Sequence, residues 1–315
     1  MARAGARGAR DLRGKGAALI VVLGLLAVLA AVAAEAAWST TRMLARAEGL
    51  AARMRADWAA RSALALAALA LSEDARHASE TPYDGLDEPW AQPAPPYPVD
   101  GGVITGRVED ASGKLDLNSL VDPRGRVNPA LNQALRRLFA LLEIDPLLVD
   151  ALIDWIDRDD QPFGPGGAED ASYVAEGRRV KNAPLDTVDE LGAVMGFTPE
   201  IVARLKPYLW ARPPQAAPAA VNLNTASLEV LASLFPNLPR ASIEAFVEAR
   251  PFASVAEALN ALGARAPAGL RLSIRSDWFI VHADARFDRA EARWRYLVRR
   301  SGTQVVLVRA ELEGE

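Results

Sequence analysis

An uncharged run near the N-terminus constrains this chain more than any other feature. Residues 17–34 read AALIVVLGLLAVLAAVAA and contain no charged side chain. As a helix this run would span roughly 27 Å, close to the hydrocarbon thickness of a bilayer. Helix-forming residues continue without a proline until Pro82, so we expect one helix from Ala17 to about Arg76. The sequence therefore predicts a membrane-spanning helix that continues well beyond the membrane.

The charges around this run predict its orientation. Residues 1–16 hold five basic side chains and one acidic one, whereas the rest of the chain holds 31 basic and 39 acidic residues. Because short basic segments stay on the cytoplasmic side, the body of the protein should lie on the other side. A removable secretory signal also has a basic head and an apolar run. The residues that flank the run are compatible with such a signal and also with an ordinary membrane anchor.

The outer half of the predicted helix has an apolar stripe. Leu50, Met54 and Trp58 recur every four residues, while Arg53 and Arg55 can face water. Such spacing places the three apolar side chains on one helix face. We expect this stripe to pack on the body.

The segments after the helix predict a small sheet. Six prolines within residues 81–102 indicate an extended linker. Alternating or β-branched stretches then predict strands at Val103–Asp110, Lys114–Leu117, Trp278–Arg286, Ala292–Arg300 and Val305–Leu312. We expect the first two to form a hairpin, and the last three to be joined by turns at Asp288-Arg289 and Ser301-Gly302.

The middle of the chain, residues 119–270, has helical periodicity. Helices are predicted at Pro129–Leu142, Pro146–Ile156, Val188–Met195, Pro199–Leu209, Ser227–Leu234, Arg240–Ala249 and Ser254–Leu262. The predicted fold class is therefore α+β. A long N-terminal transmembrane and amphipathic helix packs on a small antiparallel sheet, and a large all-α insertion interrupts this domain.

An internal repeat lies within the insertion. The tetrapeptide at 116–119 (DLNS) parallels that at 222–225 (NLNT), and the segment 185–196 parallels 252–263. Asn, Ser and Thr in such positions are helix-capping signals. The pattern predicts a duplicated module rather than a solenoid, because the two stretches differ in length.

Several motifs together carry a family resemblance. The junction Gly14-Lys15-Gly16 before the apolar run resembles the processing site of type IV prepilins and pseudopilins. Five further motifs follow in order: LDLNSL (115–120), ALIDWIDRDDQP (151–162), GAEDASYV (167–174), NAPLDTVDELG (182–192) and VNLNTA (221–226). The chain thus resembles the type II secretion system protein K family, the largest minor pseudopilin, over nearly its whole length.

The resemblance implies how the chain is processed and divided. A membrane peptidase would cut between Gly16 and Ala17, which makes Val21 the fifth mature residue. Most pseudopilins carry Glu there, but this family does not. The implied parts are a cytoplasmic prepilin leader (1–16), a transmembrane helix (17–37), its periplasmic continuation (38–80), a linker with the first pilin-like strands (81–118), a helical insertion with helix–hairpin–helix-like repeats (119–270) and the C-terminal strands (271–315).

The resemblance also implies a function without catalysis. The protein would sit in the bacterial inner membrane as a single-pass protein with its bulk in the periplasm. It would join minor pseudopilins I and J at the tip of the pseudopilus and help to initiate assembly for the export of folded proteins across the outer membrane. Further partners would be the major pseudopilin filament and the prepilin peptidase. A tethered periplasmic protein without a filament role stays possible.

An acidic motif is the candidate metal site. Asp150, Asp154 and Asp157 share one helix face, and further carboxylates follow at 159, 160, 169 and 170. Negative charge is disfavoured at a helix C-terminus, so a cation should compensate. We predict Ca²⁺, bound by Asp154, Asp157, Asp159 and Asp170 near the Gly/Pro loop 164–167; the family resemblance also implies calcium. The alternative is a solvated acidic face or a set of salt bridges with Arg178, Arg179 and Lys181.

A second possible function is membrane-anchored DNA binding. Val221–Leu234 with Arg240–Ala249 resembles the helix–hairpin–helix modules of competence DNA receptors. Those modules bind phosphate through a glycine-rich hairpin, whereas Phe235–Pro239 contains no glycine and two prolines. A net acidic body also disfavours DNA, so we expect no nucleic-acid partner.

Enzyme signatures are missing from the sequence. The two histidines, His77 and His282, lie in different predicted elements, and neither a phosphate-binding loop nor a Gly-x-Ser-x-Gly motif occurs. We therefore predict that the protein is not an enzyme.

Overall fold

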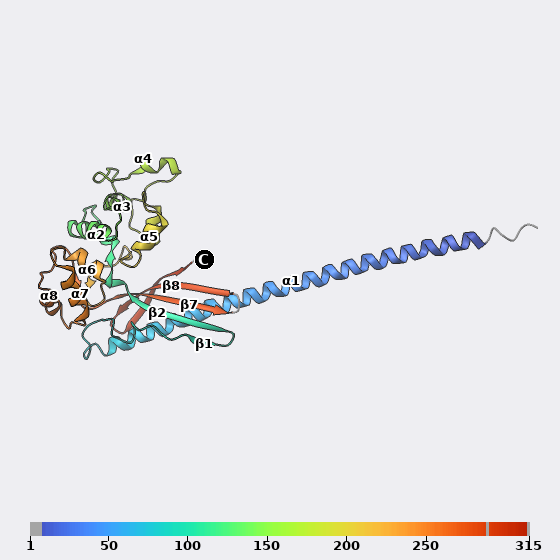
Figure 1. The fold of residues 1–315 in the computed structure, drawn as a ribbon, viewed down its shortest axis with the longest axis horizontal. Coiled ribbons are helices and arrows are strands. Elements are labelled where there is room, and N and C mark those ends of the chain that lie inside the picture. Colours follow the sequence, from blue (N-terminus) through green and yellow to red (C-terminus); the bar gives the residue numbers. More distant parts are fainter. Residues whose placement is uncertain (1–7, 288–289, 314–315) are drawn as a thin grey trace, which may run out of the picture.

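The computed structural model describes residues 8–287 and 290–313, with the backbone alone for residues 8–17 and 176. The predicted turn Asp288-Arg289 lies outside these residues. A single helix, α1 (Gly8–Arg76), projects far from the rest of the chain (Figure 1). The helix ends at Arg76, as the sequence predicted. It begins before Ala17, so residues 8–16 of the basic leader are also helical.

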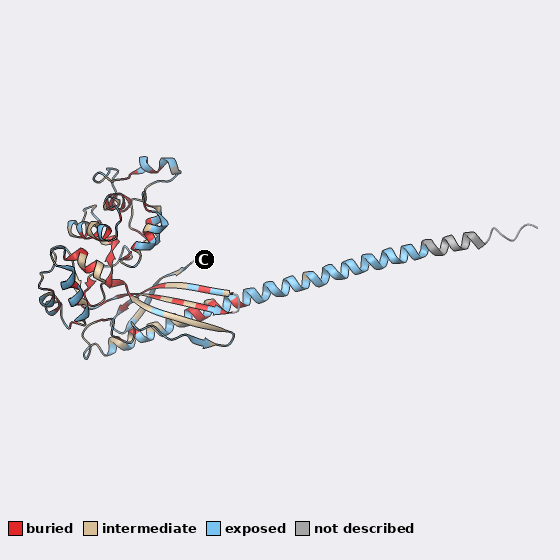
Figure 2. Ribbon diagram, in the orientation of Figure 1, coloured by how far each residue is buried: buried red, intermediate tan, exposed pale blue. Residues whose placement is uncertain are grey.

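The first part of α1 stands apart from the body. Among its described side chains, none between Ala18 and Ala51 is buried, as Figure 2 shows. This part is long and apolar enough to cross a membrane.

The last part of α1 lies on a five-stranded antiparallel sheet. The strand order is β1-β2-β7-β8-β9. The strands are β1 (Tyr97–Val99), β2 (Gly102–Asp110), β7 (Trp278–Phe287), β8 (Ala290–Ser301) and β9 (Gln304–Leu312). The core between helix and sheet contains Ala56, Ala60 and Leu71 of α1. The three C-terminal strands agree with the sequence prediction to within two residues.

The face of α1 that packs on the sheet is not the predicted one. Leu50, Met54 and Trp58 are 62%, 54% and 65% exposed, whereas the buried positions are mainly alanines. The sheet supplies aromatic side chains such as Phe279 and Tyr296, and small side chains on the helix fit best against such bulk. The prediction that the Leu–Met–Trp stripe packs on the body was therefore wrong.

The predicted hairpin at 103–117 was also wrong. β2 pairs with β1 and β7, and the chain then leaves the sheet. Asp110 accepts a hydrogen bond from Ser112 N (2.7 Å) and starts a short 3₁₀ helix, η1 (Ala111–Gly113). The next strand, β3 (Leu115–Asp116), pairs in parallel with β4 (Leu209–Trp210), which lies almost a hundred residues later.

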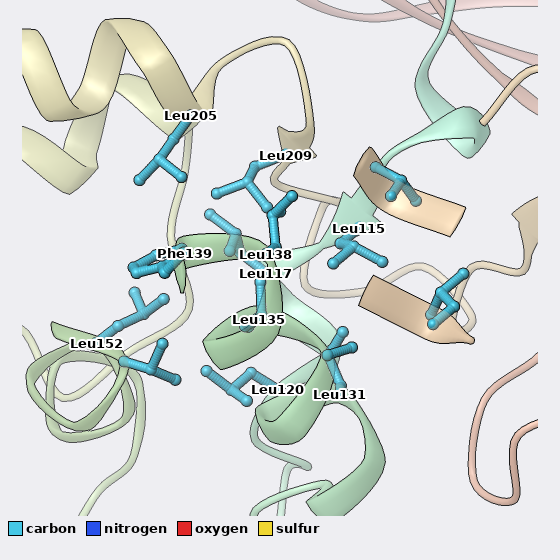
Figure 3. Packing of buried hydrophobic residues seen from close by; sticks show 14 of the residues in the cluster. Leu115, Leu117, Leu120, Leu131, Leu135, Leu138, Phe139, Leu152, Leu205 and Leu209 are labelled. Atoms are coloured by element: carbon cyan, nitrogen blue, oxygen red, sulfur yellow. The ribbon is translucent and has the colours of Figure 1, made fainter. Parts of the chain in front are cut away.

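The insertion between β2 and β7 contains two modules. The first module runs from β3 to β4 and contains η2 (Leu117–Ser119), α2 (Pro129–Leu141), α3 (Leu148–Ile156), α4 (Asp170–Tyr173), η3 (Val174–Glu176), η4 (Val188–Ala193) and α5 (Pro199–Leu205). The second module runs from β5 (Val221–Asn222) to β6 (Leu272–Ser273) and contains α6 (Leu228–Leu234), α7 (Arg240–Glu248) and α8 (Val255–Leu262). One hydrophobic core joins both modules, and Figure 3 shows its leucine-rich part around Leu117, Leu135 and Phe139.

The predicted repeat is confirmed in atomic detail. The side chain of Asn118 donates to Leu185 O and accepts from Leu185 N, each at 2.8 Å. Asn224 makes the same pair of bonds with Phe252, at 3.0 and 2.9 Å. Each module therefore uses a buried asparagine to fix the start of its repeated segment, which is 185–196 in the first module and 252–263 in the second.

A buried polar network joins the sheet to the second module. Asp110 at the end of β2 accepts hydrogen bonds from Asn222 (3.0 Å), Thr225 (2.5 Å) and Ser276 (2.5 Å). Burial raises the pKa of Asp110, and these donors oppose that shift. Because the three donors come from both ends of the second module, the network fixes where this module joins the sheet.

Candidate metal centre in the acidic loop

The candidate site begins with α3, whose polar face is buried along with its apolar face. Asp150 is fully buried, forms an ion pair with Arg136 of α2 and accepts a hydrogen bond from Gly166 N (3.1 Å). A buried carboxylate is costly unless it is paired in this way. Arg136 is thus a compensating cation in addition to the three predicted from the sequence.

The next carboxylate on this face holds the loop that follows α3. Asp154 accepts hydrogen bonds from Phe163 N (2.8 Å) and Ala168 N (2.6 Å). Burial raises the pKa of Asp154, and these two amides oppose the shift. Its main geometric role is to fold residues 157–169, the acidic loop, back onto the end of α3.

Glycines allow the acidic loop to approach this closely. A Cβ atom on Gly164 would lie 2.8 Å from an Asp150 oxygen, and one on Gly167 would lie 2.7 Å from an Asp154 oxygen. Gly164 also has a φ of 64°, in the left-handed region that glycine adopts at low cost. Larger residues at either position would push the loop away from the two aspartates.

Three carboxylates meet where α3 ends. Asp157, Asp159 and Glu169 each place one oxygen within 4.8 Å of the other two. Asp157 Oδ1 and both oxygens of Glu169 are buried and have no hydrogen-bond partner among the described residues. Buried oxygens without donors are costly, so this cluster fits a hard cation, for which carboxylate oxygens are suitable ligands.

The electrostatics of the cluster agree with this interpretation. Burial, then the charges of Asp159 and Asp154, raise the pKa of Asp157 to about 7. Burial also raises the pKa of Glu169 to about 7, with smaller effects from Asp154 and Asp157. Without a cation, protons would neutralise this site near neutral pH.

The structure places the four predicted ligands differently. Asp157 and Asp159 lie in the cluster, Asp154 lies beside it, and Asp170 accepts a hydrogen bond from Val180 N (3.0 Å) at the start of α4. Glu169 takes the third position, and the predicted set omitted it. Glu169 adjoins Ala168, whose amide bonds to Asp154, but no feature of the sequence alone shows which of the neighbours Glu169 and Asp170 faces inward.

The cations of the salt-bridge alternative have other contacts. Lys181 pairs with Asp186 and Glu190, both at 2.8 Å. Arg178 donates to Ala193 O (2.9 Å), and its guanidinium lies 5.7 Å from the centre of the Tyr173 ring. Arg179 is exposed. These contacts hold the chain after α4 against η4.

A second acidic cluster lies near the end of α1. Asp74, Asp84 and Glu88 also converge, but Arg300 pairs with Asp74 (2.6 Å) and with Asp84. Glu88 accepts from Gly85 N (2.9 Å) and from Trp90 Nε1 (3.0 Å). Because this cluster already has its own cation and hydrogen-bond donors, it is a poor candidate for a metal site. The same contacts connect the linker to α1 and β8.

The hairpin of the second module offers few groups for a phosphate. Pro236 and Pro239 lack an amide hydrogen, and Leu238 N already donates to Phe235 O (3.1 Å). Phosphate binding by such modules depends on free backbone amides, so the geometry gives DNA binding no support.

Taken together, the structure defines a membrane-anchored, pilin-like protein: a long apolar helix on an antiparallel sheet, with a two-module helical insertion. The family models for "Type II secretion system (T2SS), protein K" match residues 113–214 and 221–275, which are essentially the two modules. The chain belongs to this family, and it is a minor pseudopilin of a type II secretion system.

Named relatives agree over most of the chain. The type II secretion system protein K of Pectobacterium carotovorum subsp. carotovorum is 32% identical over 96% of this chain and 97% of its own length. That of Pseudomonas aeruginosa is 37% identical over 75% of this chain and 72% of its own length. A chain in the crystal structure of the GspK–GspI–GspJ complex from enterotoxigenic Escherichia coli superimposes with a TM-score of 0.74 at 25% identity, covering 86% of this chain and 100% of that chain.

The predicted processing site stays a prediction. The backbone of Gly16 and Ala17 lies within α1, and the side chain of Ala17 is outside the described part of the chain.

Proposed function

We propose that this chain is anchored in the bacterial inner membrane by α1, with its bulk in the periplasm, and forms the tip of the pseudopilus with minor pseudopilins I and J. In this position it helps to initiate assembly of the filament that exports folded proteins. The similar chain from enterotoxigenic E. coli comes from the GspK–GspI–GspJ complex of a type 2 secretion system, which supports partners of this kind.

The position of the helical insertion is the observation that carries the proposal. The insertion leaves the sheet at Asp110 and returns at Trp278, at the end where α1 terminates and farthest from its membrane segment (Figure 1). The second module lies beyond this end of the sheet, and the first module stands to one side of it (Figure 1). Asp189 of the first module pairs with Arg295 of β8, and Asp186 O accepts a hydrogen bond from Arg309 of β9. A further subunit stacked on that end would collide with the second module, so a terminal place in a filament suits this shape.

Copurification tests the proposal. The full chain, extracted in mild detergent with coexpressed minor pseudopilins I and J, should elute with both partners. Labelling the insertion on isolated pseudopili should then mark one end of each filament. Recovery of the chain without either partner, or labels along the filament length, would contradict the proposal.

The mature chain is proposed to begin at Ala17, after removal of the leader by the prepilin peptidase. Mass spectrometry of the membrane-extracted protein should find this N-terminus. Gly16→Leu should block cleavage because a large side chain replaces a minimal one next to the cut, whereas Gly14→Leu, two residues further away, should still be cleaved. An intact Met1, or an N-terminus near residues 34–38, would indicate an ordinary anchor or a secretory signal.

Calcium is proposed as the cation of the acidic loop, bound by Asp157, Asp159 and Glu169. Ca²⁺ takes six to eight oxygen ligands in irregular geometry, so carbonyl groups or water can complete the shell. Elemental analysis after dialysis against calcium should find about one ion per chain, and less in the variant Asp157→Asn with Glu169→Gln. No bound calcium in the unsubstituted chain would contradict this proposal.

A further inference from the structure

A cavity of about 360 Å³ lies between the first module and the sheet face opposite α1, and it is named here the seam cavity. One wall is formed by β2, β7, β8 and β9, whose side chains at Ile280, His282 and Leu297 alternate with those that pack on α1. The other wall is formed by η4, β4 and the turn after α5. The volume falls within the range of about 300–1,000 Å³ that is usual for small-molecule sites.

A buried donor that lines the seam cavity has no acceptor among the described residues. Trp210, at the end of β4, is 2% exposed, and its indole Nε1 makes no hydrogen bond there. Buried tryptophans usually find a partner for this group. The centre of the Trp278 ring lies 5.7 Å from that of Trp210 and helps to hold the indole in place. A hydrogen-bond acceptor on a bound molecule would satisfy this donor.

A buried cation supplies a second donor. Lys114, just before β3, is 8% exposed and lines the same cavity. Its Nζ donates to Glu109 Oε1 (2.7 Å) and to Lys206 O (2.9 Å). An ammonium group carries three N–H bonds, so the third has no partner within the described part of the chain and is available to a ligand. Because β3 and β4 pair in parallel, Lys114 and Trp210 lie on neighbouring segments of the first module.

The carboxylate beside Lys114 is already compensated. Glu109 lies 2.7 Å from Lys114, 3.0 Å from His282 Nε2 and 3.6 Å from Arg107. Burial alone would raise the pKa of Glu109, but the hydrogen bond with His282 and the charge of Lys114 lower it to about 2. Glu109 therefore stays ionised, and its neighbours balance its charge, so it does not exclude an anion from the cavity.

The lining of the seam cavity combines positive charge with apolar surface. Five basic and three acidic side chains give it a net charge of +2, which becomes +1 when Asp189, the partner of Lys206, is counted. Arg107 and Lys206 are the most exposed of these cations, at 58% and 40%, so they can attract an anion from solution. The main apolar surface comes from Val188, Leu209, Ile280, Leu297 and Trp210. Such a lining fits a ligand that has both an acid group and an apolar body.

We propose that the seam cavity binds an apolar carboxylate, whose acid group accepts hydrogen bonds from Trp210 Nε1 and Lys114 Nζ while its apolar part contacts Leu209 and Leu297. A carboxylate suits these donors better than a neutral acceptor, because charge-assisted hydrogen bonds are stronger. A small organic acid and the C-terminus of a polypeptide both have this chemistry. The proposal goes beyond the filament role and does not depend on it. Since the ligand touches the first module and the sheet, its binding also fixes how the two sit against each other.

Calorimetric titration of the full-length chain in lipid nanodiscs, corrected with empty nanodiscs, tests the ligand chemistry. The probes are 4-phenylbutyrate and the dipeptide acetyl-Leu-Phe with a free C-terminus, and the amides of both are the controls. At least one acid should bind saturably and about tenfold more tightly than its amide. A preference for the dipeptide identifies a polypeptide C-terminus as the ligand, and a preference for phenylbutyrate identifies a small organic acid. No saturable binding of either acid up to about 10 mM, or equal binding of acids and amides, would overturn the proposal.

Two variants test the assigned site. Trp210→Phe keeps an aromatic ring but removes the N–H, so it should weaken binding about tenfold. Trp294→Phe should leave binding unchanged, because that indole donates to Asp57 on the α1 side of the sheet. Lys206→Gln removes an exposed charge and should weaken binding roughly threefold at low salt, whereas Arg240→Gln on α7 should not. The exposed Lys206 keeps the test decisive if Trp210→Phe does not fold. Unchanged affinity in every folded variant of these two positions would overturn the proposal.

Discussion

The two modules of the insertion share a framework but differ in one connection. Each has a pair of short parallel strands, and each uses an asparagine to bind the backbone of a residue much later in the module. In the second module, residues 249–251 connect α7 to Phe252. In the first module, residues 157–184 connect α3 to Leu185, and they include the acidic loop.

This difference separates what the fold requires from what the first module adds. The second module shows that the framework closes with a three-residue connection, so the acidic loop is not needed to form it. The added loop also brings a cost, because it buries carboxylate oxygens without donors. An addition that costs stability on its own is best explained by a ligand that restores it.

The largest expected effect comes from breaking the shared framework. Asn118→Ala and Asn224→Ala should each lower the free energy of unfolding by about 3 kcal/mol, because each leaves a buried N–H and a buried C=O without a partner. Asn118 should cost more, since it also donates to Arg212 O (2.6 Å). Urea denaturation measures both. The exposed Asn260→Ala serves as the control, and a loss below 1 kcal/mol at either position would show that the two modules are not equivalent.

The second largest effect should be stabilisation by calcium, which depends on the acidic loop of the first module. At a concentration a hundredfold above Kd calcium should stabilise the chain by about 2.7 kcal/mol, and thermal melting in EGTA and then in calcium measures the gain. Asp157→Asn with Glu169→Gln should abolish the response. Glu248→Gln, at the matching end of α7, should keep it. A melting temperature indifferent to calcium would leave the loop without a metal, and a gain that survives the double variant would place the ion elsewhere.

The pH dependence of stability is the third test. The folded chain holds protons on Asp157 and Glu169 up to a pKa of about 7, above their ordinary values of 3.8 and 4.5. In EGTA this stabilisation is complete below about pH 4 and is lost as the pH rises to 7. With calcium the trend should weaken, since calcium replaces the protons.

Variants separate this effect from that of the second acidic cluster. Asp157→Asn with Glu169→Gln should flatten the decline between pH 4 and 7 in EGTA. Part of the slope should remain, because burial also raises the pKa of Glu88 to about 7 and that of Asp84 to about 6. Glu88→Gln should reduce this remainder without changing the calcium response. An unchanged slope in the first variant would mean that the acidic loop is not the titrating site.

The sequence predicted features that depend on local pattern. The apolar run, the C-terminal strands and most helices of the insertion were placed within a few residues, because period and capping are encoded in short segments. Two features that depend on distant partners were wrong. The segment after Asp110 pairs with β4 rather than with β2, and the packing face of α1 follows the aromatic side chains of strands more than two hundred residues away.

The candidate site shows the same limit. The sequence located the acidic loop and two of the three converging carboxylates, Asp157 and Asp159. It placed Glu169 in the acidic motif but left it out of the ligand set, because the inward direction of that side chain depends on how the amides of Phe163 and Ala168 bind Asp154. Arg136, which pairs with Asp150, was missed because it comes from a different helix.

The smallest expected effect compares two glycines with the same backbone conformation. Gly164 in the acidic loop and Gly263 at the end of α8 have φ values of 64° and 62°. Gly263→Ala should cost about 1 kcal/mol from backbone strain alone, because a Cβ there meets nothing within 4 Å. Gly164→Ala should cost roughly 1 kcal/mol more, since its Cβ would lie 2.8 Å from an oxygen of Asp150, which is fully buried and held by Arg136.

Calcium sharpens this last comparison. Displacing the loop at Gly164 moves Glu169 relative to Asp157, so Gly164→Ala should also weaken calcium binding, whereas Gly263→Ala should not. Denaturation with and without calcium gives both quantities from one pair of variants. If the two substitutions lowered the free energy of unfolding equally in calcium, the acidic loop would tolerate displacement from α3. The close approach of its backbone to Asp150 would then have no part in metal binding.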